Sequence, residues 1–230
     1  MNSDRGYWER HASNYDASLG PLGRPLPRML QLVAGAARGA RNVLEVAAGT
    51  GLVTTCLAEQ AERVVATDYA ESMVRVLSDR VRQGGLKNVS CEQADLYDLR
   101  FDAGTFDVVV AANVLHLVPD LPGALVALRR VLAPGGRLIV PTFCHDETRL
   151  SWVVSRVLAL TGFPGHRRFE MASLVAAVER SGLVIEMRET LPGLIPVGHV
   201  HGKFLWSWFR SIVDDCFGAR SPQPSLWPPR

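Results

Sequence analysis

The sequence predicts an α/β fold in which a mostly parallel sheet is covered by helices on both faces. Short apolar runs rich in β-branched residues alternate with helical stretches from about residue 40 onward. This alternation is typical of a parallel sheet with crossover helices, and uninterrupted apolar runs are typical of strands buried on both faces. With 230 residues, of which 47% are hydrophobic, the chain can bury one substantial core.

The expected elements of this fold follow one another along the chain. Strands are expected at Asn42–Val46, Arg63–Thr67, Val89–Glu92, Phe106–Ala111 and Gly136–Phe143. Between them, apolar side chains at helical spacing predict helices at Leu52–Gln60, Ala70–Gln83 and Leu121–Leu132, the last of which is stopped by "APGG".

The pattern changes after residue 143. Helices are expected at Leu150–Leu160 and Met171–Arg180, followed by a strand near Val184–Thr190. The segment "PGLIPVGHVHGKF" offers a further strand, and its short Pro/Gly connection favours a hairpin, so this last strand should run antiparallel. A terminal amphipathic helix is expected over 205–220, and 221–230 reads as a disordered tail.

The charge balance gives no reason to expect a nucleic-acid or membrane partner. The formal net charge is +2, and charged residues make up 21% of the chain. The N-terminus lacks the apolar core of a signal peptide, and no apolar run reaches the roughly 20 residues of a spanning helix. The 4 cysteines show no metal or disulfide spacing. We therefore expect a soluble, cytoplasmic protein.

The segment "VLEVAAGTG", residues 43–51, joins the first expected strand to the first expected helix. Gly49 and Gly51 have no Cβ, so a ligand can lie against the backbone there and the turn can adopt positive φ. The helix that begins at Leu52 presents free N–H groups that favour a carboxylate or phosphate. Glu45 at the strand tip could meet a cationic amine, directly or through water.

Two further acids end the next two strands. Asp68 follows the second strand, where a carboxylate can accept both hydroxyls of a ribose. Asp95 follows the third, where it can accept from an exocyclic amine such as that of adenine. One such acid is usually a solvated cap, but acids on three successive strand tips beside a glycine turn together predict a nucleotide site.

Two nucleotide classes compete for this site. A dinucleotide fingerprint, G-x-G-x-x-G/A, needs a small residue at its last position. Counted from Gly49, that position is Thr54, which fits poorly. The chain instead has the shifted pattern Glu45-x-Ala47-x-Gly49-x-Gly51.

These motifs resemble those of the class I S-adenosylmethionine-dependent methyltransferases, in their small-molecule (type 11, UbiE-like) branch. "VLEVAAGTG" is similar to the family's first motif, with Ala47 in place of its usual first glycine. Asp68 matches the family's ribose-binding acid, and Asp95 with Ala94 and Leu96 matches its adenine-binding segment.

The likeness extends beyond the nucleotide motifs. "FDVVVAANVLHLV" and "LRRVLAPGGRLIV" are similar to the fourth and fifth strands with their neighbouring loop and helix. The N-terminal "YWERHASNYDAS" resembles the family's lid, with Tyr15 over the cofactor. The resemblance is dense over 42–142, thin over 1–41 and 143–190, and absent beyond 204.

The resemblance implies a Rossmann-like three-layer sandwich with strand order 3-2-1-4-5-7-6 and an antiparallel seventh strand. It implies a helical lid over 1–41 and a methyltransferase domain over 42–204, with S-adenosyl-L-methionine as cofactor and a small-molecule acceptor. The residues expected to bind the cofactor are Tyr15, Glu45, Ala47, Gly49, Gly51, Asp68, Tyr69, Met73, Ala94, Asp95, Leu96 and Asn113.

Catalytic candidates must follow strands four to seven. Methyl transfer is an in-line attack on the sulfonium methyl carbon, and it needs a general base only when the nucleophile arrives protonated. His116 and His145 follow strands four and five and are the candidates, with a packed helix-start histidine as the alternative for His116 and a solvated loop position as the alternative for His145. The "CHDE" and "HVH" segments could suggest a metal site, but nothing in the sequence places them together, and we expect no metal.

Several alternatives remain open at this point. The same fold serves enzymes that use S-adenosylmethionine for non-methyl chemistry or use a nicotinamide, and a silent cofactor-binding subunit is a further possibility. Nucleic acid is disfavoured as acceptor, because "ANVL" stands where base methyltransferases typically carry Asn/Asp-Pro-Pro-aromatic. Leu150–Leu160 is expected to cover the acceptor pocket, with plain core or a membrane-surface helix as alternatives, and the terminal helix could form a homodimer contact.

Overall fold

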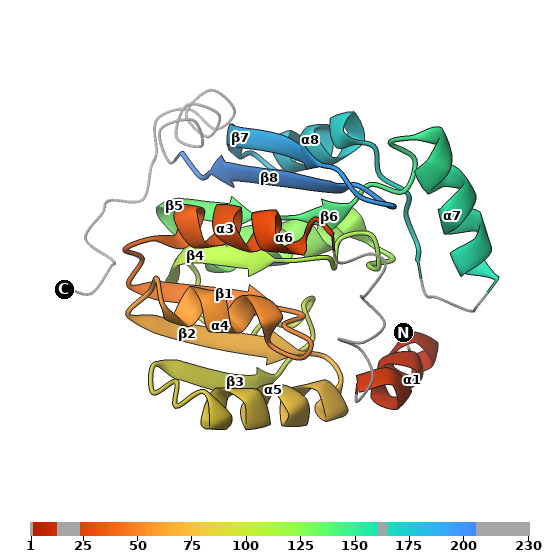
Figure 1. The fold of residues 1–230 in the computed structure, drawn as a ribbon. Coiled ribbons are helices and arrows are strands. Elements are labelled where there is room, and N and C mark those ends of the chain that lie inside the picture. The colour runs from red at the N-terminus through yellow and green to blue at the C-terminus, as the bar shows by residue number, and fades with distance from the viewer. Residues whose placement is uncertain (1, 13–23, 161–164, 206–230) are drawn as a thin grey trace.

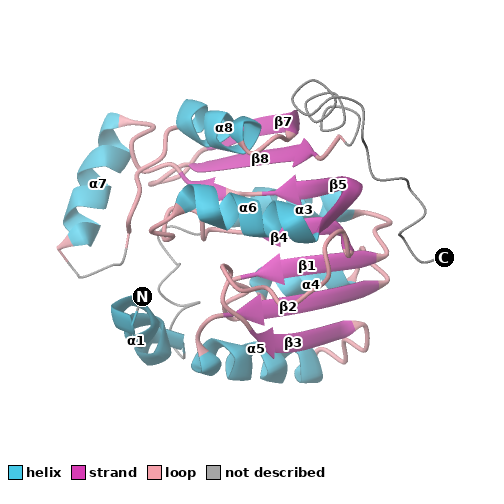
Figure 2. Ribbon diagram, turned by 180° about the vertical axis from the view of Figure 1, so that it is seen from behind, coloured by secondary structure: helices cyan, strands magenta, loops and turns pink. Residues whose placement is uncertain are grey.

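The computed structural model describes residues 2–12, 24–160 and 165–205. Tyr15, nearly all of the expected helix over 205–220 and the expected tail over 221–230 lie outside the described residues. Within them, an 8-stranded sheet is flanked by helices on both faces (Figures 1 and 2).

Five parallel strands form most of the sheet. Their bounds are β1 Asn42–Val46, β2 Arg63–Asp68, β3 Val89–Gln93, β4 Phe106–Ala111 and β5 Leu132–Ile139. The remaining strands are β6 Thr142–Phe143, β7 Val184–Leu191 and β8 Val197–Lys203. The sheet order is β3-β2-β1-β4-β5-β8-β6, with β7 paired to the other edge of β8. β8 runs antiparallel to β5, β6 and β7, which confirms the predicted antiparallel last strand inserted beside strand five.

The expected strand over Gly136–Phe143 is wrong in its bounds. Strand β5 begins earlier, at Leu132, which pairs with Phe106 before the register shifts across the "APGG" turn. It ends at Ile139, and β6 resumes the pairing with β8 after Pro141. Proline has no N–H to donate to a ladder, so the strand is interrupted there and the sheet has eight strands rather than seven.

Two apolar cores lie on opposite faces of the sheet, because successive strand residues point to opposite sides. Val43 belongs to the core under α3 and α4, whereas its neighbour Leu44 belongs to the core under α6 and α8. The helices are α1 Asn2–His11, α3 Leu26–Ala37, α4 Leu52–Ala58, α5 Glu71–Gln83, α6 Leu121–Val131, α7 Arg149–Ala159 and α8 Met171–Arg180. Helix α3 was not predicted as a separate element, and its Met29 and Val33 pack into the core.

Helix α7 has an unusual orientation. Its buried residues are Ser151 and Ser155, while Trp152 and Val157 are 46% and 59% exposed. These exposed apolar side chains contradict the alternative that Leu150–Leu160 is plain core, and its expected position over the acceptor pocket stays a prediction.

The carboxyl ends of β1 to β4 meet at one edge of the sheet, and α1 lies beside this edge in both views (Figures 1 and 2). In an open parallel sheet this edge is where ligands bind.

Candidate cofactor site

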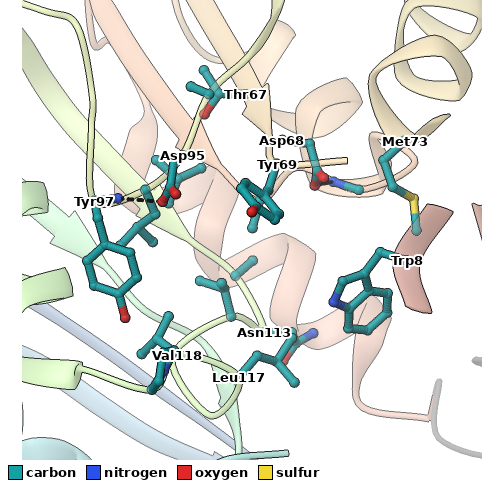
Figure 3. A pocket seen from close by; sticks show the side chains of 18 residues that line it. Trp8, Thr67, Asp68, Tyr69, Met73, Asp95, Tyr97, Asn113, Leu117 and Val118 are labelled. Carbon is teal, nitrogen blue, oxygen red and sulfur yellow. Dashed lines mark hydrogen bonds between the residues drawn. The ribbon is translucent and has the colours of Figure 1, made fainter. Parts of the chain in front are cut away.

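A cavity opens at this edge of the sheet (Figure 3). Residues from the carboxyl ends of four strands, from the start of α5 and from α1 form its wall. The predicted cofactor residues that line it are Ala47, Gly49, Asp68, Tyr69, Met73, Ala94, Asp95, Leu96 and Asn113. The fold thus gathers most of the predicted site around one cavity.

Four other predicted residues do not line this cavity. They are Glu45, Gly51, His116 and His145. Gly51 has a structural reason of its own: its φ is 88°, and an added Cβ would lie 2.6 Å from Cδ1 of Leu77 on α5. This glycine allows α5 to approach the start of α4.

Sequence reasoning also missed part of the wall. The missed residues that line the cavity include Trp8, Tyr97, Leu117, Val118 and Pro119. Tyr15, which the resemblance places over the cofactor, lies outside the described residues, and Trp8 on α1 lines the cavity.

The glycine turn is built around Asp68. The backbone N–H of Gly49 donates to Oδ2 of Asp68 at 2.8 Å, and the N–H of Ala70 donates to Oδ1 at 2.9 Å. Ala47 has a φ of 51°, Gly49 of 56° and Gly51 of 88°, so the turn uses the left-handed region three times. Asp68 therefore fixes the loops after β1 and β2 while its carboxylate lies in the cavity wall.

The Asp68 carboxylate is buried but retains acceptor capacity. Burial raises its pKa above the usual value, and the backbone N–H groups of Ala70, Gly49 and Tyr69 oppose this shift. Each carboxylate oxygen has two lone pairs, and each already accepts one backbone N–H. A second acceptor position on each oxygen can therefore meet a diol.

Asp95 and Tyr97 shape the opposite side of the cavity. The N–H of Tyr97 donates to Oδ1 of Asp95 at 2.9 Å, which fixes the carboxylate at the wall. The Tyr97 hydroxyl donates to the carbonyl of Asp120 at 3.1 Å and accepts from its N–H at 3.0 Å. Tyr97 thereby ties the loop after β3 to the start of α6.

Glu45 turns away from the cavity. Its side chain is 1% exposed, and the hydroxyl of Thr54 donates to its Oε2 at 2.5 Å. Burial, opposed by this hydrogen bond and reinforced by the charge of Asp68, raises the pKa of Glu45 to about 8. Thr54, which fits a dinucleotide fingerprint poorly, here serves as the partner of Glu45. Contact of Glu45 with a bound amine stays a prediction.

We expect Glu45→Gln to reduce the pH dependence of folding stability. Because the pKa of Glu45 is raised from 4.5 to about 8, the stability from its protonated form is fully present below about pH 4.5 and is lost as pH rises through about 8. Denaturant unfolding between about pH 5 and 9 should show the wild type losing about 3–5 kcal/mol relative to the variant. Parallel stability curves for the two proteins would show that Glu45 is already ionised at the lower pH.

His116 and His145 form a buried pair beyond the cavity wall. Their ring centroids are 5.3 Å apart, and the ring of Phe143 packs edge-on against His116. Burial, with the nearby His145, lowers the pKa of His116 to about 3, and burial with the charge of Arg168 lowers that of His145 to about 4. Both imidazoles are therefore neutral at physiological pH.

The tautomer of His145 follows from its partner. Ser155 donates its hydroxyl to the carbonyl of Ser151 at 2.6 Å, so its oxygen accepts from Nδ1–H of His145 at 2.7 Å. Nε2 of His145 is then an acceptor, and it has no hydrogen-bond partner among the described residues. The catalytic roles of His116 and His145 stay predictions.

Metal-binding geometry is absent from the described part of the chain, where no three His, Cys, Asp or Glu side chains gather suitably. His199 and His201 contact each other on β8, with Nε2 and Nδ1 3.2 Å apart.

Comparison with known protein families finds a match in the middle of the chain. The methyltransferase domain family (Methyltransf_11) matches residues 44–140, which run from the third residue of β1 to just after β5 and include the loops between these strands that line the cavity. Residues 44–140 are thus similar to a methyltransferase domain. The predicted Rossmann-like α/β fold is confirmed by the strand order and by the likeness to solved structures.

Curated relatives of the chain carry two kinds of name. The chain is 41% identical over 113 residues to a ubiquinone/menaquinone biosynthesis C-methyltransferase of Teredinibacter turnerae, covering 47% of this chain and 45% of that protein. It is 38% identical over 135 residues to nocamycin O-methyltransferase of Saccharothrix syringae, covering 57% of this chain and 48% of that protein. The chain therefore spans about half the length of the curated relatives it matches.

A solved structure supports the fold over a longer range of the chain. A SAM-dependent methyltransferase from Aquifex aeolicus aligns with a TM-score of 0.66 at 21% identity, covering 84% of this chain and 98% of that one. The described helices include none that is long and apolar enough to cross a membrane.

Proposed function

We propose that the protein is an S-adenosylmethionine-dependent methyltransferase that transfers a methyl group to a small organic acceptor. The observation that carries this proposal is the position of Asp68. Its carboxylate lies in the cavity wall and holds the glycine turn through Gly49, which is the arrangement that a ribose beside a bare backbone requires.

The residues present fit this cofactor. Gly49 brings no Cβ to the cavity, so the backbone can be approached closely there. Asp68 offers acceptor positions to the ribose hydroxyls, and Asp95 beside Ala94 and Leu96 offers an acceptor and an apolar wall to adenine. Trp8 and Met73 add apolar surface from the α1 side.

The protein's own contribution to catalysis is mainly positioning. The cofactor supplies an activated methyl group on a sulfonium centre. The turn held by Asp68 and the loop held by Tyr97 fix opposite walls of the cavity, so the two reactants can be aligned with little loss of entropy at the moment of reaction. The apolar side chains of Val114, Leu117 and Val118 limit water at the wall shared with the acceptor side.

The acceptor is a compact and largely apolar molecule. Val114, Leu117, Val118 and Pro119 follow β4 and offer apolar surface at one end of the cavity. A pocket of this composition orients its ligand through few polar groups, of which Asn113 is one. One named relative is a C-methyltransferase and the other an O-methyltransferase. Identifying the acceptor atom of this protein therefore needs an experiment.

The proposal that His116 is the general base has a kinetic test. If His116 is the base, His116→Ala should lower kcat roughly 10²-fold and leave the affinity for the cofactor little changed. The neutral imidazole can accept a proton throughout the neutral range, although its low pKa makes it a weak base. His201→Ala, which removes an imidazole from the middle of β8, is the control. Full turnover of His116→Ala on the true acceptor would assign the transfer to positioning alone.

A direct assay tests the activity. The purified protein is incubated with methyl-labelled S-adenosylmethionine and fractionated small-molecule extracts, and S-adenosylhomocysteine and labelled product are measured together. Both should appear in equal amounts in one fraction. Cofactor binding without either product would favour a silent subunit or non-methyl chemistry, and binding of NADH in its place would favour an oxidoreductase.

A cytoplasmic location and a homodimer through the segment beyond residue 205 remain part of the same proposal.

A further inference from the structure

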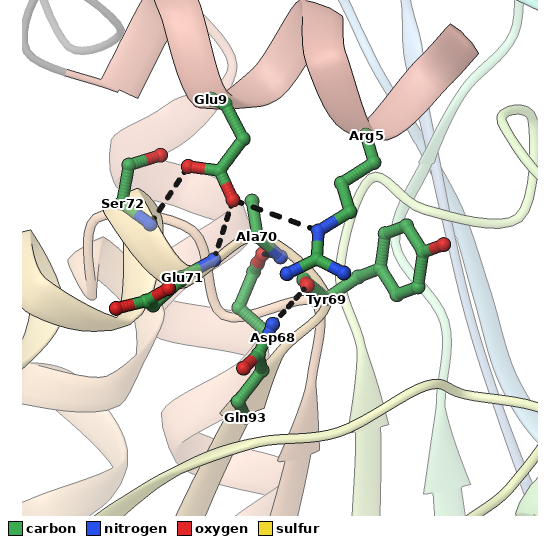
Figure 4. A network of polar contacts seen from close by, with 8 residues as sticks. All are labelled: Arg5, Glu9, Asp68, Tyr69, Ala70, Glu71, Ser72 and Gln93. Atoms are coloured by element: carbon green, nitrogen blue, oxygen red, sulfur yellow. Dashed lines mark hydrogen bonds and ion pairs between the residues drawn. The ribbon is translucent and has the colours of Figure 1, made fainter. Parts of the chain in front are cut away.

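Helix α1 contacts the segment that follows the ribose-binding acid (Figure 4). Oε1 of Glu9 accepts from the N–H of Glu71 at 2.9 Å, and Oε2 accepts from the N–H of Ser72 at 3.0 Å. These N–H groups belong to the first turn of α5 and have no partner within that helix. Glu9 therefore caps α5 from a helix that lies more than sixty positions earlier in the chain.

Helix α5 lacks a local cap. Its N-cap residue is Ala70, which makes no side-chain hydrogen bond to the helix, whereas Ser, Thr, Asp and Asn are the usual caps. Ala70 is fully buried and packs with Ala12 and Met73 in a small apolar cluster under α1. The N-cap position thus carries an apolar side chain that packs under α1, and the carboxylate of Glu9 on α1 caps the helix instead.

Helix α1 in turn depends on this contact. It has only 10 residues, includes Gly6, and has few apolar side chains to bury. An isolated helix of this length is marginal in water. In addition to the Glu9 hydrogen bonds and the apolar cluster, its attachment includes the Arg5 guanidinium, 5.3 Å from the Tyr69 ring centroid.

The residues that hold α1 lie next to residues that line the cavity. The N–H of Ala70 donates to Asp68, whereas the next two N–H groups donate to Glu9. Asp68, Tyr69 and Met73 line the cavity, and so does Trp8, the neighbour of Glu9 on α1. Displacing Glu9 would therefore move Trp8, which belongs to the cavity wall.

We propose that Glu9 is a positioning residue for cofactor binding, which caps α5 and thereby holds Trp8 in the cavity wall. This inference rests on the proposed function of the cavity. It has a reciprocal consequence: a ligand that contacts Trp8 stabilises the docked α1, and docking of α1 strengthens ligand binding.

Calorimetry with S-adenosylhomocysteine tests the effect on binding. Glu9→Ala should weaken binding about 5–20-fold, in keeping with the loss of a helix cap. Glu71→Gln is the matched control, because it removes a negative charge from the same helix end and leaves both N–H contacts to Glu9, and its affinity should stay within about twofold of the wild type. Wild-type affinity in Glu9→Ala would overturn the proposal.

A double-mutant cycle tests whether Glu9 acts through Trp8. If it does, Trp8→Ala combined with Glu9→Ala should bind no more weakly than Trp8→Ala alone. Fully additive losses would show that Glu9 acts independently of Trp8, and this would contradict the proposed route.

Hydrogen exchange of the ligand-free protein provides a readout besides binding. The amides of Glu71 and Ser72 and those of α1 should exchange at least tenfold faster in Glu9→Ala than in the wild type, while the amides of β4 stay unchanged. Equal exchange would overturn the capping contact. If the wild type fails to bind S-adenosylhomocysteine, the proposed function falls, whereas failure in Glu9→Ala alone concerns only the role of Glu9.

Discussion

Asp68→Ala should weaken S-adenosylmethionine binding about 10–150-fold, which corresponds to roughly 1.5–3 kcal/mol for hydrogen bonds to a charged acceptor. The carboxylate lies in the cavity wall and is expected to accept the ribose hydroxyls. It also holds the N–H groups of Gly49 and Ala70, so the variant should lose about 1–3 kcal/mol of stability as well.

Titration calorimetry on protein shown to be folded by circular dichroism measures the Asp68 effect. Asp98→Ala removes an exposed acid whose side chain is 71% accessible and which pairs with Arg100 outside the cavity, so its affinity should match the wild type. If folded Asp68→Ala binds S-adenosylmethionine as the wild type does, Asp68 does not belong to the cofactor site.

Gly49→Val should abolish detectable cofactor binding. The residue has a φ of 56°, a conformation that β-branched side chains rarely adopt, and it lines the cavity where the ligand must approach the backbone. The valine side chain would therefore strain the turn that Asp68 holds and occupy space that the ligand needs.

Gly85→Val separates these two effects. Gly85 has a φ of 63°, and an added Cβ there meets nothing within 4 Å, so this variant carries a similar backbone strain away from the cofactor cavity. We expect it to lose stability and keep cofactor affinity, as measured by thermal unfolding and calorimetry. Normal binding by Gly49→Val would mean that the turn serves the fold alone.

The strongest local patterns predicted the fold. The bounds of β1, β4 and α8 agree with the expected Asn42–Val46, Phe106–Ala111 and Met171–Arg180. These elements could be predicted because an apolar run or a helical spacing of apolar residues depends only on the residues of the segment itself. The gathering of Asp68 and Asp95 at one cavity followed from the parallel order of their strands.

Contacts between distant segments could not be predicted in this way. No local pattern tells that Glu9 caps α5, since the two are joined only by the tertiary fold. The side chain of Glu45 sits on the expected strand, but its burial against Thr54 depends on how α4 packs. The interruption at Pro141 did carry a local signal, because a proline inside a strand removes a donor.

A crystal structure of the wild-type protein with S-adenosylhomocysteine tests the central claim most directly. The account predicts that the ligand fills the described cavity, with both ribose hydroxyls within hydrogen-bond distance of Asp68, adenine against Asp95 and Leu96, and Trp8 in contact with the ligand. A ligand bound elsewhere, or bound in this cavity without contact between its ribose and Asp68, would contradict the account.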